Sequence, residues 1–248
     1  ASDPVNFVKQ FKSVLTPKTR AVSISAVHWC TGMPIPLDPV GKICSERGIE
    51  LVVDGAQGVG MQPIDVRDLK ISFMAFSAWK WLMGPLGLGV LFIDKTKLES
   101  LKPVFIGTNS VVNSMSYLPY KTTLKPDADR FTFSTPNFCD WVYFLASLDF
   151  LEKTGFQNVL ERIYYLTDTL NGFLRQTGCK IISDRFPDHP TAITVFEVPG
   201  LPASKVIDHL TKNEIIATER LGKVRMAPHI FNSPAQLDKA ASVIEAIM

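Results

Sequence analysis

Two largely apolar runs, each followed by a charged residue, constrain the fold of this chain most strongly. The run 51–53 is followed by Asp54, and the run 71–79 is followed by Lys80. Continuous apolar runs without polar alternation are typical of strands in parallel sheets that are covered on both faces. We therefore expect an α/β layer whose strands end in polar groups at one edge of a mostly parallel sheet.

The remaining pattern predicts a change of architecture half-way along the chain. Strands and helices alternate in the first half, the segment 105–130 lacks periodicity and indicates a long loop, and the second half predicts long helices and a smaller α+β unit. We divide the chain into residues 1–135, part of a large domain, and residues 136–248, connecting helices and a small domain. The expected strands are 19–26, 49–54, 70–78, 89–93, 191–198, 215–218 and 223–226.

Capping signals set the expected helix ends. Asp38 and Pro39 indicate the N-cap and first residue of a helix that ends at Gly48. Thr135-Pro136 predicts the start of a helix that is closed by Gly155, and further helices are expected at 157–176 and 203–212. Ser233 and Pro234 begin a last helix, with Gln236 at the capping-box position.

Charge, hydropathy and cysteine spacing argue against several classes of protein. The 248 residues carry a net charge of +2 with basic and acidic residues interspersed, which does not favour a nucleic-acid partner. No apolar stretch is long enough to span a bilayer, and the first residues show no signal-peptide pattern. The four cysteines are far apart and lack zinc-site spacing, so we expect a chain without a metal. We also expect a reduced, cytoplasmic chain, and the alternative is a mature, processed protein, which would show the same pattern.

Lys80 and Asp54 together indicate a cofactor. An amine that leaves a buried strand between two tryptophans is desolvated, which lowers its pKa and suits a Schiff-base former. A carboxylate can keep a pyridine nitrogen protonated, so the pair matches pyridoxal phosphate. Taken alone, Asp54-Gly55 also fits a plain turn, and Lys80 an ordinary surface lysine whose stem is buried. Their positions on successive strand ends, 80 − 54 = 26 residues apart, favour the cofactor site.

Several segments resemble the class V aminotransferase group of fold-type I pyridoxal-phosphate enzymes. This group includes cysteine desulfurases, cystine and cysteine-sulfoxide lyases, isopenicillin-N-epimerase-like proteins and several aminotransferases. The resemblance implies a partial fold-type I large domain followed by a small domain. The segments that carry it are Val-Asp-Gly-Ala-Gln at 53–57, Ser-Ala-Trp-Lys-Trp-Leu-Met-Gly-Pro-Leu-Gly-Leu-Gly at 77–89, Gly-Thr at 107–108, Phe-Thr-Phe-Ser-Thr-Pro-Asn at 131–137, and Val-Arg-Met-Ala-Pro-His-Ile-Phe-Asn at 224–232.

By matching position, the resemblance implies a role for seven residues. Lys80 would form the Schiff base, Asp54 would pair with the pyridinium, and Gln57 would bond the ring oxygen. Ser77 would bind the phosphate, and Thr108 would reach the neighbouring subunit of a homodimer. Arg225 would hold the α-carboxylate of an amino-acid substrate. His28 either lies at the mouth of the site or is a structural histidine at a strand end.

The chain departs from the family pattern in two places. Many relatives carry histidine immediately before the Schiff-base lysine, whereas this chain has Trp79. Family members also have a long N-terminal portion before the region that corresponds to residue 1. The resemblance therefore implies either a fragment of a longer protein or a shortened gene.

The cysteine pattern disfavours a desulfurase, because none of the four cysteines lies in a segment that the family uses to accept sulfur. We expect a C–S lyase or an epimerase-like enzyme, on the resemblance of the stretch at 80–82. The alternatives are an aminotransferase, or a truncated and catalytically silent member that retains the fold and dimerisation.

Overall fold

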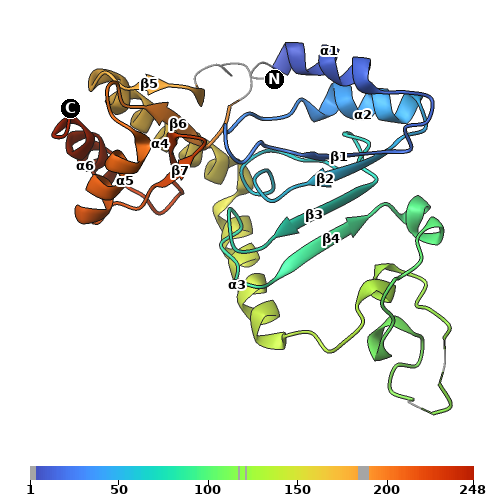
Figure 1. Cartoon of the computed structure of the whole chain (residues 1–248). Coiled ribbons are helices and arrows are strands. Elements are labelled where there is room, and N and C mark those ends of the chain that lie inside the picture. The colour runs from blue at the N-terminus through green and yellow to red at the C-terminus, as the bar shows by residue number, and fades with distance from the viewer. Residues whose placement is uncertain (1–3, 117, 121, 184–189) are drawn as a thin grey trace.

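Two four-stranded sheets, one in each half of the chain, organise the structure (Figure 1). It is a computed structural model, and it describes residues 4–116, 118–120, 122–183 and 190–248. The first sheet contains β1 (Ala21–Ser25), β2 (Glu50–Asp54), β3 (Phe73–Ser77) and β4 (Gly89–Ile93), in the order β1-β2-β3-β4.

The first sheet is mostly parallel, as predicted. Strands β1, β2 and β3 run parallel, and β4 is antiparallel to β3. The register places Ser25 beside Asp54 and Asp54 beside Ala75. The carboxyl ends of the three parallel strands therefore meet at one edge, which faces the second lobe in Figure 1.

Two helices pack against the first sheet. Helix α1 (Pro4–Val14) was not predicted, although Phe7, Val8 and Phe11 form an apolar stripe against the same core as β1 and β2. Helix α2 spans Leu37–Glu46, so the predicted N-cap at Asp38 is wrong: the N-cap is Pro36, and Asp38 lies in the first turn. Burial of Leu37 in the core extends the helix by two residues at this end, and Asp38 pairs with Lys42 at 2.9 Å.

The segment between β4 and the next long helix contains only short 3₁₀ turns in its described part. These are η1 (Lys95–Ser100), η2 (Thr108–Ser110) and η3 (Ala128–Phe131). Figure 1 shows the segment extending away from the edge that faces the second lobe. The predicted long loop at 105–130 therefore agrees with the structure apart from these turns.

Two long helices connect the lobes. Helix α3 (Phe138–Thr154) begins after Asn137, whose side chain accepts hydrogen bonds from the next turn, so the start predicted at Thr135-Pro136 is early. Helix α4 (Phe156–Gln176) follows after Gly155. Residues from both helices pack with Trp81 and Leu82 of the first lobe in a shared cluster. No helix of the described residues is long and apolar enough to cross a membrane.

The second sheet is antiparallel and smaller. It contains β5 (Lys180–Ile181), β6 (Thr194–Glu197), β7 (Thr218–Arg220) and β8 (Lys223–Met226), in the order β5-β6-β8-β7. The predicted strand at 223–226 is confirmed, the one at 191–198 is shorter, and the one at 215–218 lies too early because the chain straightens only at Thr218. Helices α5 (Ala203–Lys212) and α6 (Pro234–Glu245) pack on this sheet, and the predicted capping box of Ser233 and Gln236 is present.

Successive side chains along the strands of the second sheet point to opposite faces of the sheet. Phe196 and Val224 point into the core formed with α4, α5 and α6. Val195, which is paired with Arg225 in the register, belongs instead to the cluster shared with the first lobe. Arg225 therefore lies on the face that is turned toward the first sheet. The domain boundary at residue 135 stays a prediction.

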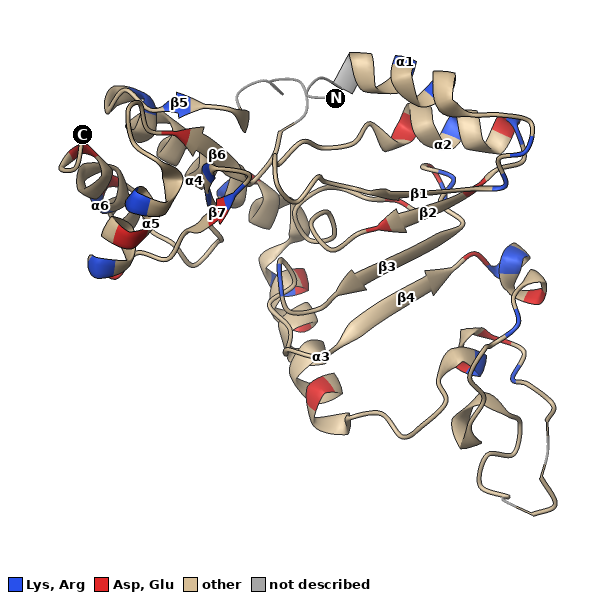
Figure 2. Cartoon of the chain, viewed as in Figure 1, with Lys and Arg blue, Asp and Glu red and all other residues tan. Residues whose placement is uncertain are grey.

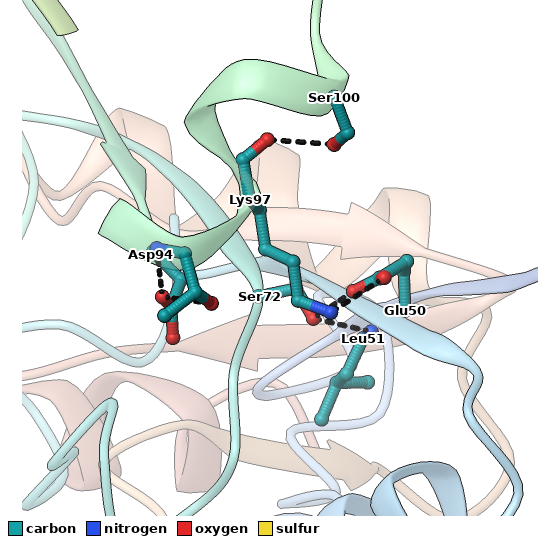
Figure 3. A network of polar contacts seen from close by, with 7 residues as sticks. Glu50, Leu51, Ser72, Asp94, Lys97 and Ser100 are labelled. Atoms are coloured by element: carbon teal, nitrogen blue, oxygen red, sulfur yellow. Dashed lines mark hydrogen bonds and ion pairs between the residues drawn. The ribbon is translucent and has the colours of Figure 1, made fainter. Parts of the chain in front are cut away.

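A network of polar contacts fastens the amino ends of β2 and β3 (Figure 3). The Glu50 carboxylate pairs with Lys97 Nζ at 2.7 Å and accepts a hydrogen bond from Ser72 Oγ at 2.7 Å. Ser72 Oγ in turn accepts from the backbone N–H of Leu51 at 3.2 Å. The side chain of Asp94 caps η1, which positions Lys97. These groups satisfy one another at the end of the sheet remote from Asp54.

Candidate active site

A cavity of about 600 Å³ lies where the carboxyl ends of the parallel strands face the second sheet. An adjoining hollow of about 540 Å³ extends past the end of β3, and both share Asp54, Ala56 and Trp79 in their linings. Crevices outside the carboxyl ends of parallel strands are the usual ligand sites of α/β sheets. The predicted residues Asp54, Gln57, Lys80 and Arg225 line the larger cavity, and Ser77 lines the hollow.

The electrostatic environment of Lys80 matches the expectation from sequence. The side chain is half-buried, and its Nζ lies 5.2 Å from the centre of the Trp79 ring. Burial lowers the pKa of the Lys80 amine, the carboxylate of Asp54 opposes this change, and the charge of Arg225 adds to it. The net effect is a pKa below the ordinary lysine value, which increases the unprotonated, nucleophilic fraction of the amine.

Hydrogen bonds orient the two polar side chains of the turn after β2. Asp54 Oδ1 accepts from the backbone N–H of Ala56 at 2.9 Å, and Gln57 Oε1 accepts from Trp81 Nε1 at 3.2 Å. An indole N–H can only donate, so the amide oxygen of Gln57 must face Trp81. The NH₂ group of Gln57 is thereby left as a donor for an acceptor in the cavity.

Three buried side-chain atoms of the described residues have no hydrogen-bond partner, and all three belong to this site. They are Ser77 Oγ, Thr218 Oγ1 and Arg225 Nε. Ser77 lines the hollow, whereas Thr218 and Arg225 line the cavity. Buried polar groups in folded proteins are almost always paired, because leaving one unpaired costs about 1–3 kcal/mol. Their concentration at one place is what a site that pairs them with a ligand requires.

Two predicted residues, His28 and Thr108, line neither the cavity nor the adjoining hollow. The ring of His28 is half-buried and its Nδ1 contacts Thr31 Oγ1 at 3.0 Å and the Thr31 backbone N–H at 3.3 Å, which is the arrangement of a structural turn. Burial lowers the pKa of His28 and favours its neutral form. Thr108 is exposed in η2, in the segment that extends away from the cavity.

The turn that contains Thr108 packs against the segment 131–137, which also resembles the family pattern. Gly107 packs so closely that a Cβ there would lie 1.9 Å from the carbonyl oxygen of Phe133. Asn109 Nδ2 donates to the carbonyl oxygen of Ser134 at 2.8 Å. The segments 107–108 and 131–137 therefore form one surface, and the absence of a side chain at Gly107 is what allows it.

Several residues that the sequence reading did not single out complete the cavity. Trp29 contributes a ring that is 51% exposed, and the guanidinium of Arg220 stacks over it at 5.2 Å. Buried His229 stacks on Trp81 with ring centres 5.6 Å apart. His229 lies in the quoted segment 224–232 and could have been found there. Thr218 and Arg220 are two residues apart in a short strand and therefore share one face of it. Only the pairing of β7 with β8 shows that this is the face of Arg225.

The cavity is predominantly cationic. Lys80, Arg220 and Arg225 line it, whereas Asp54 is the only acidic side chain in its described lining. Figure 2 shows basic residues beside β6 and β7, whereas β3 and β4 carry no charged residue. Burial lowers the pKa of Arg225, and the neighbouring charge of Arg220 lowers it further. Such a cavity favours an anionic ligand.

Comparison with known proteins identifies the family. A family model described as aminotransferase class-V matches residues 4–230. The chain belongs to this family. The predicted family and the fold-type I fold are thereby confirmed. Because this is a family of pyridoxal-phosphate enzymes, the expected cofactor and the expectation of an enzyme are confirmed at the level of the family.

Curated relatives match nearly the whole chain but extend beyond it. A probable cysteine desulfurase of Pyrococcus abyssi is 28% identical over 92% of this chain and 60% of its own length. The isopenicillin N epimerase of Streptomyces clavuligerus is 26% identical over 99% of this chain and 65% of its own length. The chain thus spans about 60% of the length of these relatives.

Solved structures show the same fold. The cystine C-S lyase C-DES, in complex with its product cysteine persulfide, aligns with a TM-score of 0.89 at 22% identity and covers 96% of this chain and 64% of its own. The apo cysteine desulfurase of Thermococcus onnurineus NA1 aligns with a TM-score of 0.84 at 24% identity, over 92% of this chain and 60% of its own. A variant of C-DES carries glycine covalently linked to its PLP cofactor.

Proposed function

We propose that this chain is a pyridoxal-phosphate-dependent enzyme that acts on an amino acid through a bond between Lys80 and the cofactor, with a C–S lyase or epimerase-like reaction. The observation that carries the proposal is the set of unpaired groups around Lys80. Ser77 Oγ and Arg225 Nε are buried without partners; Arg225 lines the same cavity as the half-buried Lys80 amine, and Ser77 lines the adjoining hollow. A phosphate and a carboxylate are acceptors that these two donors can bind.

The residues of the cavity fit the cofactor. When bound, pyridoxal phosphate supplies an electron sink for negative charge that develops at the substrate Cα. Asp54 would hold the proton on the ring nitrogen, and the NH₂ group of Gln57 would donate to the ring oxygen because Trp81 occupies its carbonyl. Ser77 Oγ would donate to the phosphate.

Lys80 has two uses in this arrangement. Its lowered pKa leaves more of the amine unprotonated, which is the nucleophilic form that would bind the aldehyde group of the cofactor. Once displaced by the substrate amine, the same nitrogen would take the proton from Cα and return it as a general acid. Delivery of a proton by a second acid to the opposite face of Cα would give epimerisation, and departure of a Cβ substituent with its bonding electrons would give elimination.

Arg225 would hold the substrate α-carboxylate. Its side chain lines the cavity from β8, and it makes no ion pair with a carboxylate of the described residues. A guanidinium presents two parallel N–H groups to a carboxylate, which fixes orientation as well as charge. This orientation determines which bond at Cα is aligned for cleavage.

The cysteines support a reaction other than desulfuration by this chain. Cys30, Cys44 and Cys179 are buried, Cys139 is exposed, and none of the four lines the cavity. A lyase or an epimerase needs no thiol acceptor. The free state of all four cysteines also supports the proposed cytoplasmic location.

We also propose that the chain acts as a homodimer. Helix α3 exposes Trp141, Val142, Tyr143 and Leu145, and such apolar patches mark interaction surfaces. A second copy on this surface could bring Thr108 to the neighbouring cofactor site. Light scattering at several protein concentrations tests this expectation, which a constant monomer mass would contradict.

Covalent trapping tests the proposed function. The purified chain is incubated with pyridoxal phosphate, reduced with borohydride and mapped by peptide mass spectrometry. We expect a phosphopyridoxyl group on Lys80 because its amine is the one with a lowered pKa inside the cavity. The matched control is Lys42→Ala, which removes an exposed lysine of α2 and should leave the Lys80 adduct unchanged.

Loss of the adduct in Lys80→Ala, with the fold retained by circular dichroism, would support the assignment. Amino acids are then screened for pyruvate and ammonia, for inversion at Cα, and for keto-acid formation. Keto acid as the main product would indicate an aminotransferase. A folded wild-type chain without an adduct at Lys80 would contradict the proposal and favour a catalytically silent member.

A further inference from the structure

One cation of the cavity has no role in the proposed function. Lys80 is assigned to the cofactor and Arg225 to the α-carboxylate, and Asp54 is the acidic group in the described lining. Arg220 remains, and it makes no ion pair with a carboxylate of the described residues. By contrast, Lys97, Lys180 and Lys223 each pair with a glutamate. Arg220 therefore adds positive charge to a cavity that already has an excess of it.

The register of the second sheet places Arg220 close to Arg225 and on the same face. Thr218 lies directly opposite Arg225 across β7 and β8, and Arg220 is two residues further along β7. Residues in this diagonal relation have Cα atoms about 7–8 Å apart. Two guanidinium groups thus project from neighbouring strands into one cavity, at a spacing that suits two anionic groups of one small molecule.

One contact with the first lobe and one within β7 orient the Arg220 guanidinium. It stacks over the ring of Trp29 at 5.2 Å, and its Nη1 donates to the carbonyl oxygen of Glu219 at 2.7 Å. Stacking on an aromatic face leaves the N–H edges of the guanidinium plane available for planar acceptors. The side chain is half-buried, so an anion bound there would be partly shielded from water.

A third group supports a ligand at this position. Thr218 Oγ1 is buried without a hydrogen-bond partner, and it lines the cavity on the strand that carries Arg220. Ser77 lies in the adjoining hollow, which Arg220 does not line. The phosphate proposed for Ser77 therefore leaves Arg220 and Thr218 without an acceptor.

We propose that Arg220, stacked on Trp29, is a second anion-binding residue of the cavity, and that the substrate is an amino acid whose side chain ends in a carboxylate or a similar anion. This inference rests on the proposed function for the assignment of Arg225. The two guanidinium groups hold the two ends of the substrate, and Thr218 donates to one of its anionic groups.

Calorimetric titration of the full chain without cofactor tests the proposal. The probes are glutarate and glutaramate, which have the same length and differ in one carboxylate replaced by an amide. We expect glutarate to bind about tenfold more tightly at fixed low ionic strength, because only its second carboxylate forms a charge-assisted pair.

Variants separate the two guanidinium groups. Arg220→Gln should bind glutarate only as tightly as glutaramate, with the affinity for glutaramate unchanged. Arg220→Lys keeps the charge without the planar fork and should retain part of the preference, which controls for loss of folding. Arg225→Gln should weaken both probes. Arg47→Gln removes an exposed arginine at the end of α2 and should change neither.

Three results would overturn the inference. These are no measurable binding of glutarate to the wild-type chain, equal binding of the two probes, and a preference that persists in Arg220→Gln. A fall in affinity for inorganic phosphate in Arg220→Gln, with the glutarate preference intact, would assign Arg220 to the cofactor phosphate instead. Trapping at Lys80 is independent of these titrations, so a failure here and a failure of the proposed function are distinguishable.

Discussion

The two ends of the first sheet differ in how they treat polar groups. At the amino ends of β2 and β3, Glu50, Ser72 and Lys97 pair with one another and with the backbone (Figure 3). At the carboxyl ends and in the sheet that faces them, Ser77, Thr218 and Arg225 each have one buried side-chain atom without a hydrogen-bond partner. The same kinds of group thus stabilise the fold at one end and are available for a ligand at the other.

Replacement of a hydroxyl at the paired end should have the largest effect on stability. Ser72→Ala removes a donor to Glu50 and leaves the backbone N–H of Leu51 without an acceptor. We expect the free energy of unfolding to fall by about 1–3 kcal/mol. Urea denaturation measures it, and a change below about 0.5 kcal/mol would mean that the network does not support the fold.

Low pH should have the second-largest effect on stability, because it removes the charge of Glu50 at the paired end. Burial raises the pKa of Glu50, but hydrogen bonds from Lys97 and Ser72 outweigh this, and the net pKa lies below the ordinary value. A carboxylate with a lowered folded pKa stabilises the protein above its unfolded pKa, about 4.3, and this contribution is lost as the pH falls through the folded pKa.

Glu50→Gln should therefore flatten the fall in stability over that acidic range. Urea midpoints measured at several pH values between neutral and acid provide the comparison. The control is Glu46→Gln, because Glu46 is exposed and forms no ion pair with the described residues. A pH profile in Glu50→Gln that superimposes on the wild type would contradict the assigned role of the Lys97–Glu50 pair.

The smallest change in stability is expected at the unpaired end. Thr218→Val keeps the shape of the side chain and removes a hydroxyl that has no partner. Since no hydrogen bond is lost, the free energy of unfolding should fall by less than about 0.5 kcal/mol, or it should rise slightly. A loss above about 1 kcal/mol would show that this hydroxyl is already satisfied in the free protein.

Local sequence patterns were sufficient for most of the fold. The apolar runs predicted the strands that end at Asp54 and near Ser77, and Ser233 with Gln236 predicted the last helix. The predictions were less accurate at positions where tertiary packing, rather than the local sequence, decides where a helix begins. Burial of Leu37 moved the start of α2 away from Asp38, and α1 was missed although its apolar stripe was visible.

The sequence also located only some residues of the candidate site. Asp54, Gln57 and Lys80 could be placed because they follow predicted strands within one lobe. Arg220 and Thr218 could not, because their approach to Arg225 depends on the register of β7 and β8. The sequence left His28 either at the mouth of the site or as a structural histidine at a strand end, and in the structure its ring contacts Thr31 in a turn.

Ligand-dependent stability tests the contrast between the two ends most directly. Unfolding of the wild type, Ser72→Ala and Ser77→Ala is measured with and without saturating pyridoxal phosphate. At about 100 times the dissociation constant, the cofactor should stabilise the wild type and Ser72→Ala equally, by about 2.7 kcal/mol. Ser77→Ala should be nearly as stable as the wild type without cofactor and gain about 1.5 kcal/mol less with it. Equal gains in all three proteins, or none in the wild type, would contradict the assignment of the unpaired end to the cofactor.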